Sequence, residues 1–175
     1  MSSDNSIFKR NSSVNFISKE LGEDSLEKII NAAIWAPSSR NGQPWRIIGL
    51  KHGTTNFNKI IEASSEGNQK WASKAGIILA FCTNKFDGEL NPKTFLDIGF
   101  SGQNAMLQAT ELGLETHPYG GWNEDLVKKV LNIPSNAKVA FLLAIGYPGT
   151  FQNKKNRERN KLELNFSFDE WNERF

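Results

Sequence analysis

Apolar residues recur at the spacing of an α-helix in residues 24–35, where they form one face. Asp24 stands at a capping position, and Glu27 follows three residues later, as in a capping box. Pro37 ends the pattern, because the residue before a proline avoids helical geometry. We therefore predict the first core helix over residues 24–35. Its apolar face consists of Leu26, Ile29, Ile30, Ala33 and Ile34.

A longer helical pattern covers residues 92–114, with a proline in its first turn and Gly113 near its end. Gly99, Gly102 and Ala105 recur at helical spacing within it, and such small residues permit close packing in the middle of the fold. We predict shorter helices over residues 57–63, 68–74 and 123–131, with Asn123 as the N-cap of the last.

Apolar runs without helical periodicity predict strands between these helices. Residues 77–83 read IILAFCT, a nearly continuous apolar run that is typical of a strand buried on both faces. Residues 139–145 have the same character, and two further strands are predicted over residues 45–50 and 115–119. Helices and strands thus alternate, and no repeat or internal linker divides the chain. We predict a single domain over residues 1–175.

Both ends of the chain are polar. Residues 1–15 are predicted as an irregular arm, and after Pro148 the chain turns polar and basic. Residues 166–175, FSFDEWNERF, are amphipathic enough for a short docked helix. The aromatic side chains of this tail need a surface to cover, either on their own domain or on a second subunit. We predict that residues 1–15 and 150–175 pack on a partner subunit.

The composition is that of an ordinary globular protein, with 38% hydrophobic and 23% charged residues among 175. A net charge of +2 is too small to indicate nucleic-acid binding. Cys82 is the single cysteine, so no internal disulfide forms, and its apolar neighbours favour a buried thiol. No apolar stretch approaches the roughly 20 residues of a membrane span, and the N-terminus lacks the apolar core of a signal peptide. We expect a cytoplasmic protein.

The stretch APSSRNGQPW, residues 36–45, is unusual behind an apolar helix. Ser38, Ser39, Asn41 and Gln43 offer short donors and acceptors on a segment that two prolines stiffen. Such groups suit the edge of a flat heterocycle, where donors and acceptors alternate. They equally suit a well-bonded turn after the helix, and the chemistry of the loop alone leaves both interpretations open.

This stretch resembles the signature of the FMN-dependent nitroreductase family, which carries an APSxxNxQPW-type segment after its first core helix. Further motifs of the family recur in order and cover nearly the whole chain. They are Asp97-Ile98-Gly99 with Gln103-Asn104, Leu112-Gly113-Leu114, Gly120-Gly121-Trp122, Ile145-Gly146-Tyr147-Pro148, and Arg157-x-Arg159 with Leu162-Glu163. The resemblance implies an α+β fold with a central mixed, mainly antiparallel sheet flanked by helices, and an intertwined homodimer with FMN at its interface.

The resemblance also implies which residues bind FMN. The cofactor's phosphate would meet the N-terminal motif Arg10-Asn11-Ser12 and the tail residues Arg157 and Arg159, because guanidinium groups pair with phosphate oxygens. Val14 stands where the family has a second basic residue, which is a departure from the pattern. Without the resemblance, the two tail arginines would be a solvated charge run.

The resemblance places the pyrimidine edge of the flavin ring near Gln69 and Lys70, for which a plain surface helix is the alternative. Gly120 and Gly121 would lie against the ring, with the Gly121 N–H bonded to flavin N5; an ordinary turn is the alternative. From the other subunit, the ring and ribityl chain would be contacted by Pro37, Ser38, Ser39 and Asn41.

The activity that the resemblance implies is FMN-dependent oxidoreduction. NADH or NADPH would give hydride to the flavin, leave, and be replaced by a nitroaromatic, a quinone or a similar acceptor. The flavin carries the chemistry, so no catalytic acid or base is assigned. No metal-ligand motif appears, and His117 is interpreted as a structural residue. The alternatives are a flavin store or sensor without turnover, a dehalogenating or flavin-fragmenting enzyme of the same fold, and a nucleic-acid-binding tail.

Overall fold

The computed structural model describes residues 5–84, 86, 90–150 and 157–171. Its centre is a sheet in the order β1-β5-β3-β2, and β4 also pairs with β5. The ladders between these strands are antiparallel, and Ser12 and Thr116 form an isolated parallel bridge. β5 pairs with three strands and thereby connects most of the sheet. The strands are β1 (Phe16–Ile17), β2 (Trp45–Lys51), β3 (Ile77–Thr83), β4 (Glu115–Tyr119) and β5 (Val139–Pro148).

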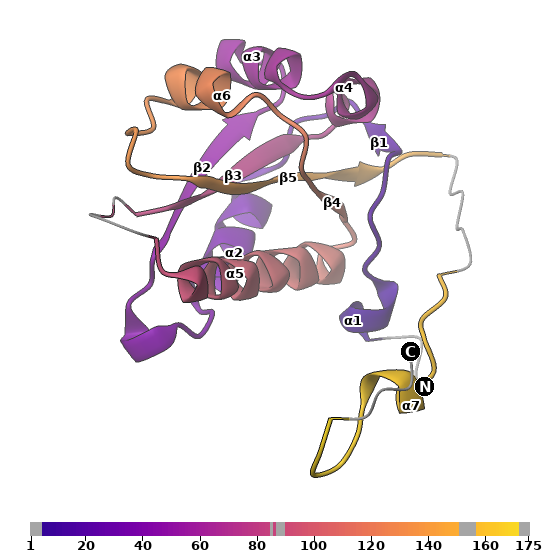
Figure 1. Ribbon diagram of the computed structural model, residues 1–175. Coiled ribbons are helices and arrows are strands. Elements are labelled where there is room, and N and C mark those ends of the chain that lie inside the picture. Colours follow the sequence, from indigo (N-terminus) through magenta and orange to yellow (C-terminus); the bar gives the residue numbers. More distant parts are fainter. Residues whose placement is uncertain (1–4, 85, 87–89, 151–156, 172–175) are drawn as a thin grey trace.

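Helices cover both faces of this sheet (Figure 1). One face carries α2 (Glu23–Ile34) and α5 (Pro92–Glu111), and the other carries α3 (Thr55–Ala63), α4 (Glu66–Ala72) and α6 (Glu124–Leu131). Two short helices, α1 (Ser6–Lys9) and α7 (Leu162–Asn165), lie outside these layers. The predicted α+β architecture, a mainly antiparallel sheet flanked by helices, is therefore confirmed.

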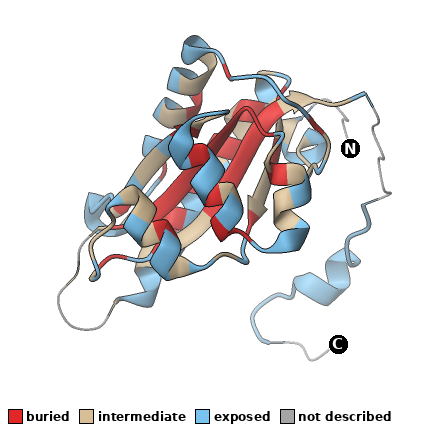
Figure 2. Ribbon diagram, turned by 90° about the horizontal axis from the view of Figure 1, so that it is seen from above, coloured by how far each residue is buried: buried red, intermediate tan, exposed pale blue. Residues whose placement is uncertain are grey.

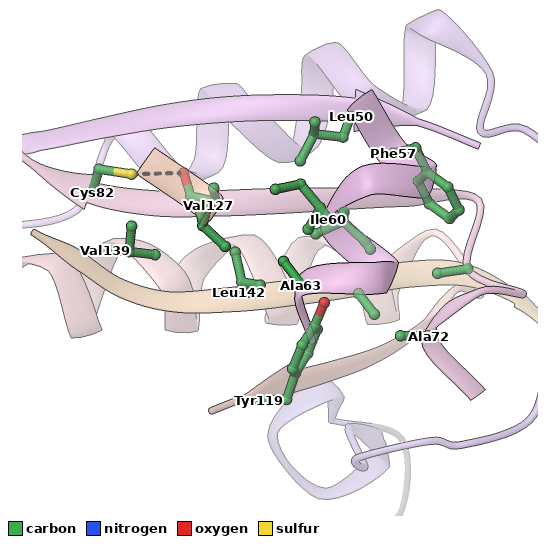
Figure 3. Packing of buried hydrophobic residues seen from close by; sticks show 14 of the residues in the cluster. Leu50, Phe57, Ile60, Ala63, Ala72, Cys82, Tyr119, Val127, Val139 and Leu142 are labelled. Carbon is green, nitrogen blue, oxygen red and sulfur yellow. Dashed lines mark hydrogen bonds between the residues drawn. The ribbon is translucent and has the colours of Figure 1, made fainter. Parts of the chain in front are cut away.

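The residues of β3 explain why two helical layers are needed. All seven are buried, and the first six alternate between two separate hydrophobic clusters. Ile78, Ala80 and Cys82 pack toward α3 and α6, where Phe57, Ile60, Val127 and Leu142 complete the cluster (Figure 3). Ile77, Leu79 and Phe81 pack toward α2 and α5, where they meet Ile29, Ile98 and Ala105. Burial raises the pKa of the Cys82 thiol to about 11, as expected for an inert cysteine.

Most predicted elements are confirmed, but the start of the first core helix is wrong. Gly22 occupies the N-cap of α2, and no side chain caps this end. Asp24 lies inside the first turn, where its carboxylate favours the helix dipole and pairs with Lys28 at 2.8 Å. Glu27 is therefore not part of a capping box. The helix predicted over residues 68–74 begins two residues earlier, as α4.

The two ends of the chain also differ from the prediction. The N-terminal arm is not wholly irregular, because α1 forms there with the Asn5 side chain as its cap. The helix predicted at residues 166–175 is absent from residues 166–171, and the remainder lies outside the described residues. A short helix, α7, precedes it instead. The described tail, residues 157–171, is exposed and extends away from the sheet (Figure 2). Among the described residues, no helix has the length and apolarity required to cross a membrane.

Replacing Gly102 by Ala should destabilise the protein. A Cβ at this position of α5 would overlap the Phe141 ring, which is itself stacked on Phe81 with centroids 4.6 Å apart. Overpacking of this kind costs about 1–3 kcal/mol, so the Tm measured by thermal denaturation should fall by several degrees. Gly67→Ala in α4 is the control, because nothing lies within 4 Å of its added Cβ. Equal Tm values for the two variants would contradict this packing.

Candidate functional site

The loop after α2, residues 36–44, has a strained and tightly held backbone. Arg40, Asn41 and Gln43 have φ angles of 52°, 55° and 44°. This left-handed region costs a residue with a side chain about 1–2 kcal/mol. The Gln43 N–H donates to the Ser38 hydroxyl at 3.0 Å, and the Gln43 side chain donates to the Asn41 carbonyl at 3.2 Å. Such strain persists where the surroundings fix it, and it concentrates at functional sites.

A buried carboxylate on α5 anchors this loop. Asp97 is only 7% exposed, and its Oδ2 accepts a hydrogen bond from the Ser39 N–H at 3.1 Å. Because a buried charge is costly unless it is bonded, this contact fixes the loop relative to α5. Pro37, Ser39 and Asn41 are exposed, and Ser38 is half-buried. The loop therefore presents its polar groups to the outside of its own protomer.

A second group of predicted site residues lies along β4. The Ser13 N–H donates to the Thr116 carbonyl at 2.9 Å, and Nδ1 of His117 lies 2.8 Å from the Ser13 carbonyl. Ser12 forms the parallel bridge with Thr116, whose hydroxyl donates to the Asn11 carbonyl at 3.4 Å. These contacts hold the N-terminal motif against β4.

Arg10, Arg157 and Arg159 gather at the start of this motif, and we call them the arginine cluster. The Arg157 guanidinium donates to the carbonyl of Arg10 and, at 2.6 Å, to that of Phe8. Burial, followed by the charges of Arg157 and Arg159, lowers the pKa of Arg10. Within the described residues no carboxylate forms an ion pair with any of the three. Guanidinium groups gathered without an acid are suited to pair with an oxyanion such as phosphate.

At the far end of β4 the chain turns at Gly120 and Gly121. The Asn68 side chain donates to the Gly120 carbonyl at 2.6 Å, and the Ser65 N–H donates to the Gly121 carbonyl at 2.7 Å. Gly121 has a φ of 83°, and an added Cβ would lie 3.1 Å from the Ser65 hydroxyl oxygen. The turn itself thus requires glycine here. In the described part of the chain the Gly121 N–H donates no hydrogen bond, so it is available to a ligand.

Of the predicted ring-edge residues on α4, Gln69 is already engaged within the fold. Its side chain donates to the carbonyls of Ser64 at 2.8 Å and Glu62 at 3.3 Å, at the C-terminal end of α3. Lys70 is exposed. Asn68, which the sequence analysis did not select, is the α4 side chain that reaches the glycine turn. In the sequence, Asn68 stands next to Gln69 in the run NQK. Only the orientation of the helix decides which of the two amides faces β4.

His117 joins these pieces. Its ring stacks on Trp71 of α4 with centroids 4.2 Å apart and planes 18° apart, and Tyr119 packs edge-on against the same indole. Together with its contact to Ser13, this stack ties α4, β4 and the N-terminal motif into one unit. The structural role predicted for His117 agrees with these contacts.

The structure does not bring the loop and the β4 group together in one protomer. Asp97, which anchors the loop, lies in the second turn of α5, whereas β4 starts just beyond Glu111 at the other end of that helix. At 1.5 Å per residue, these two positions on α5 are about 20 Å apart. Figure 1 shows the separation: α1 lies near the C-terminal end of α5, and the loop lies at the opposite end.

Comparisons with known proteins all indicate one family. The model of the nitroreductase family matches residues 7–78 and 49–147. An Archaeoglobus fulgidus protein with the provisional name NADH dehydrogenase/NAD(P)H nitroreductase is 27% identical over 150 residues, covering 81% of this chain and 83% of that protein. The FMN reductase (NADPH) of Bacillus subtilis is 24% identical over 162 residues, covering 81% and 64%. A solved oxidoreductase containing FMN superposes with a TM-score of 0.78 at 29% identity, covering 85% and 78%.

Replacing His117 by Asn should make stability less sensitive to acid. Burial lowers the pKa of His117, the Ser13 carbonyl opposes this effect, and Arg10 lowers the pKa further. The folded-state pKa lies below the unfolded value of about 6.5. The unfolded chain therefore takes up more protons, and the stability present above this value is lost as the pH falls toward the folded-state pKa.

The measurement is the Tm of both proteins between about pH 7.5 and pH 5. The Tm of the wild type should fall more steeply than that of His117→Asn over this interval. Parallel curves would contradict a half-buried histidine with a lowered pKa at this position.

Proposed function

Because the chain belongs to the nitroreductase family, we propose that it is an FMN-dependent oxidoreductase that takes hydride from NADH or NADPH and reduces electron-poor acceptors such as nitroaromatics and quinones. When bound, FMN supplies the hydride chemistry. The protein holds the cofactor, orients it and shields it from water. The names of the relatives support FMN as the cofactor and NADH or NADPH as the donor. In this chain, the arginine cluster is the observation on which the proposal rests.

The arginine cluster fits the FMN phosphate. The Arg157 guanidinium lies on the Arg10 carbonyl, and the charges of Arg157 and Arg159 act on the partly buried Arg10. Among the described residues no acid pairs with any of the three. A phosphate dianion would relieve the mutual repulsion of the three groups. Val14, at the position where the family has another basic residue, is 56% exposed. The cluster offers three charges without that residue, so we propose that its loss does not abolish cofactor binding.

The glycine turn fits the flavin ring. The Gly121 N–H is unpaired within the described residues, and Gly120 has no side chain to block a flat ring. Asn68 and Ser65 fix this turn through its carbonyls, which leaves the N–H free for flavin N5. We propose Lys70 for the pyrimidine edge, and Gln69 contributes by holding α4 on α3 through its side-chain amide rather than by contacting the flavin.

A second copy of the chain would complete the site. The loop with Pro37, Ser38, Ser39 and Asn41 lies at the other end of α5 from the arginine cluster, so an antiparallel pairing of two α5 helices would bring one protomer's loop to its partner's cluster. Large exposed apolar side chains mark the surface for this pairing. They are Ile34 and Trp35 at the end of α2, Phe95, Leu96 and Phe100 on α5, and Leu162, Phe166, Phe168 and Trp171 on the tail.

Removing the two tail arginines should release the cofactor. In the Arg157→Ala/Arg159→Ala variant, FMN binding should weaken at least about a hundredfold, because each charge-assisted bond contributes about 1.5–3 kcal/mol. The Kd is measured by fluorescence titration of the apoprotein with FMN. Lys59→Ala/Lys129→Ala removes the same charge from exposed positions on α3 and α6 and should bind FMN normally. An unchanged Kd in the arginine variant would overturn the assignment of the phosphate site.

Introducing a charge on the exposed face of α5 should separate the protomers. Leu96 is 56% exposed there, whereas Leu126, which is 47% exposed, lies on α6 in the opposite layer. Leu96→Arg should halve the mass measured by light scattering and lower FMN affinity, because the loop then comes from no partner. Leu126→Arg should remain dimeric. A dimeric Leu96→Arg protein would place the interface elsewhere.

Turnover separates the proposed enzyme from a flavin store or sensor. Steady-state oxidation of NADH and NADPH is followed with a quinone or a nitroaromatic as acceptor. We expect acceptor-dependent consumption of at least one donor, with the parallel double-reciprocal plots of a ping-pong cycle. A protein that retains FMN but consumes neither donor would be a store or sensor instead.

A further inference from the structure

We propose that Arg40 selects anionic substrates, so that the site favours acceptors or donors whose carboxylate or phosphate group reaches this loop. This inference rests on the proposed function, because it requires the loop of one protomer to reach the FMN of its partner. It concerns a residue between two that the proposal places on the cofactor, Ser39 and Asn41.

The conformation of Arg40 is unusual for its residue type. Its φ of 52° is left-handed, a region that arginine enters at a cost and that glycine or asparagine enters more readily. The hydrogen bonds of the loop, with the Ser39 N–H on Asp97 and the Gly42 N–H on the Ser39 carbonyl at 2.9 Å, hold the chain in this conformation. The backbone of Arg40 is therefore fixed, so the side chain that carries the charge begins at a defined position.

The charge of Arg40 is not used within the protomer. The side chain is exposed, and within the described residues its guanidinium forms neither an ion pair nor a hydrogen bond. The carboxylate of Asp97, which the same loop contacts, accepts from Ser39 instead. Arg46, nearby in the sequence, differs because its guanidinium donates to the Trp45 carbonyl at 2.9 Å.

The position of Arg40 determines which anion it would meet. The arginine cluster already supplies three cations for the FMN phosphate, whereas the loop belongs to the ring side of the site. A substrate stacked on the flavin ring would therefore present its own substituents to Arg40. The planar guanidinium pairs with carboxylate and phosphate in a two-bond geometry, and it offers nothing comparable to a neutral amide.

The test compares two pairs of substrates. The members of the acceptor pair differ in charge and little in shape, and the members of the donor pair differ by one phosphate group. The acceptor pair is 4-nitrobenzoate and 4-nitrobenzamide, and the donor pair is NADPH and NADH. The ratio of kcat/KM within each pair is measured for the wild type, Arg40→Gln, Arg40→Lys and the control Arg46→Gln. The same two compounds are used with every variant. The difference in their intrinsic reactivity therefore cancels when the ratios of two variants are compared.

We expect Arg40→Gln to lower the anionic-to-neutral ratio of at least one pair by about tenfold, mainly through KM, as loss of one charge-assisted bond predicts. Arg40→Lys should retain part of the preference, and Arg46→Gln should retain all of it. A change in the acceptor pair identifies a carboxylate on the acceptor, and a change in the donor pair identifies the 2′-phosphate of NADPH. Unchanged ratios, or an equal loss for charged and neutral substrates, would overturn the inference.

Failure of the proposed function gives a different result. A wild-type protein that binds FMN but turns over no substrate contradicts the enzyme, and Arg40 is then tested by binding alone. Titration of the flavin absorption bands with benzoate and benzamide should give a benzoate Kd that Arg40→Gln raises about tenfold and a benzamide Kd that it leaves unchanged. Equal effects on both Kd values, or a protein that binds no FMN, would overturn the inference.

Discussion

The length of α5 is the constraint on which the rest of the account depends. Asp97, which holds the strained loop, and the C-terminal end of α5 at Glu111 are about 20 Å apart, so one protomer keeps the two halves of the proposed site separate. The same helix exposes Phe95, Leu96 and Phe100 along one face. An antiparallel partner would bury that face and bring each loop to the other protomer's arginine cluster. Cofactor binding and dimer formation are therefore one proposal rather than two.

Within each protomer, β4 connects the residues proposed to bind the cofactor. Its first residues hold the N-terminal motif through Thr116 and His117, and its last residues lead into the glycine turn. Stacking of Trp71 on His117 adds α4 to the same unit. The proposed phosphate end and ring end of the site are thus connected through five residues of strand. A local change in β4 would therefore affect both proposed ends of the site.

The sequence was most informative where a single local rule decides the structure. The limits of β3 were predicted without error, because a continuous apolar run between polar residues leaves no other choice, and Asn123 caps α6 as expected. Glu23 and Asp24 stand side by side, so the sequence alone did not fix the first residue of α2. β1 has only two residues, which is too short to show an alternation of apolar and polar positions. The sequence also does not show which of Asn68 and Gln69 turns toward β4. Neighbouring amides are equivalent in sequence, and tertiary packing alone directs one to β4 and the other to α3.

The central claim is that this chain binds FMN and reduces it with a nicotinamide donor. The most direct measurement is the visible absorption spectrum of the purified protein, after addition of FMN and removal of the excess, before and after anaerobic NADH or NADPH. The account predicts flavin bands that remain with the protein and bleach when a donor is added. A colourless protein that takes up no FMN would contradict the account.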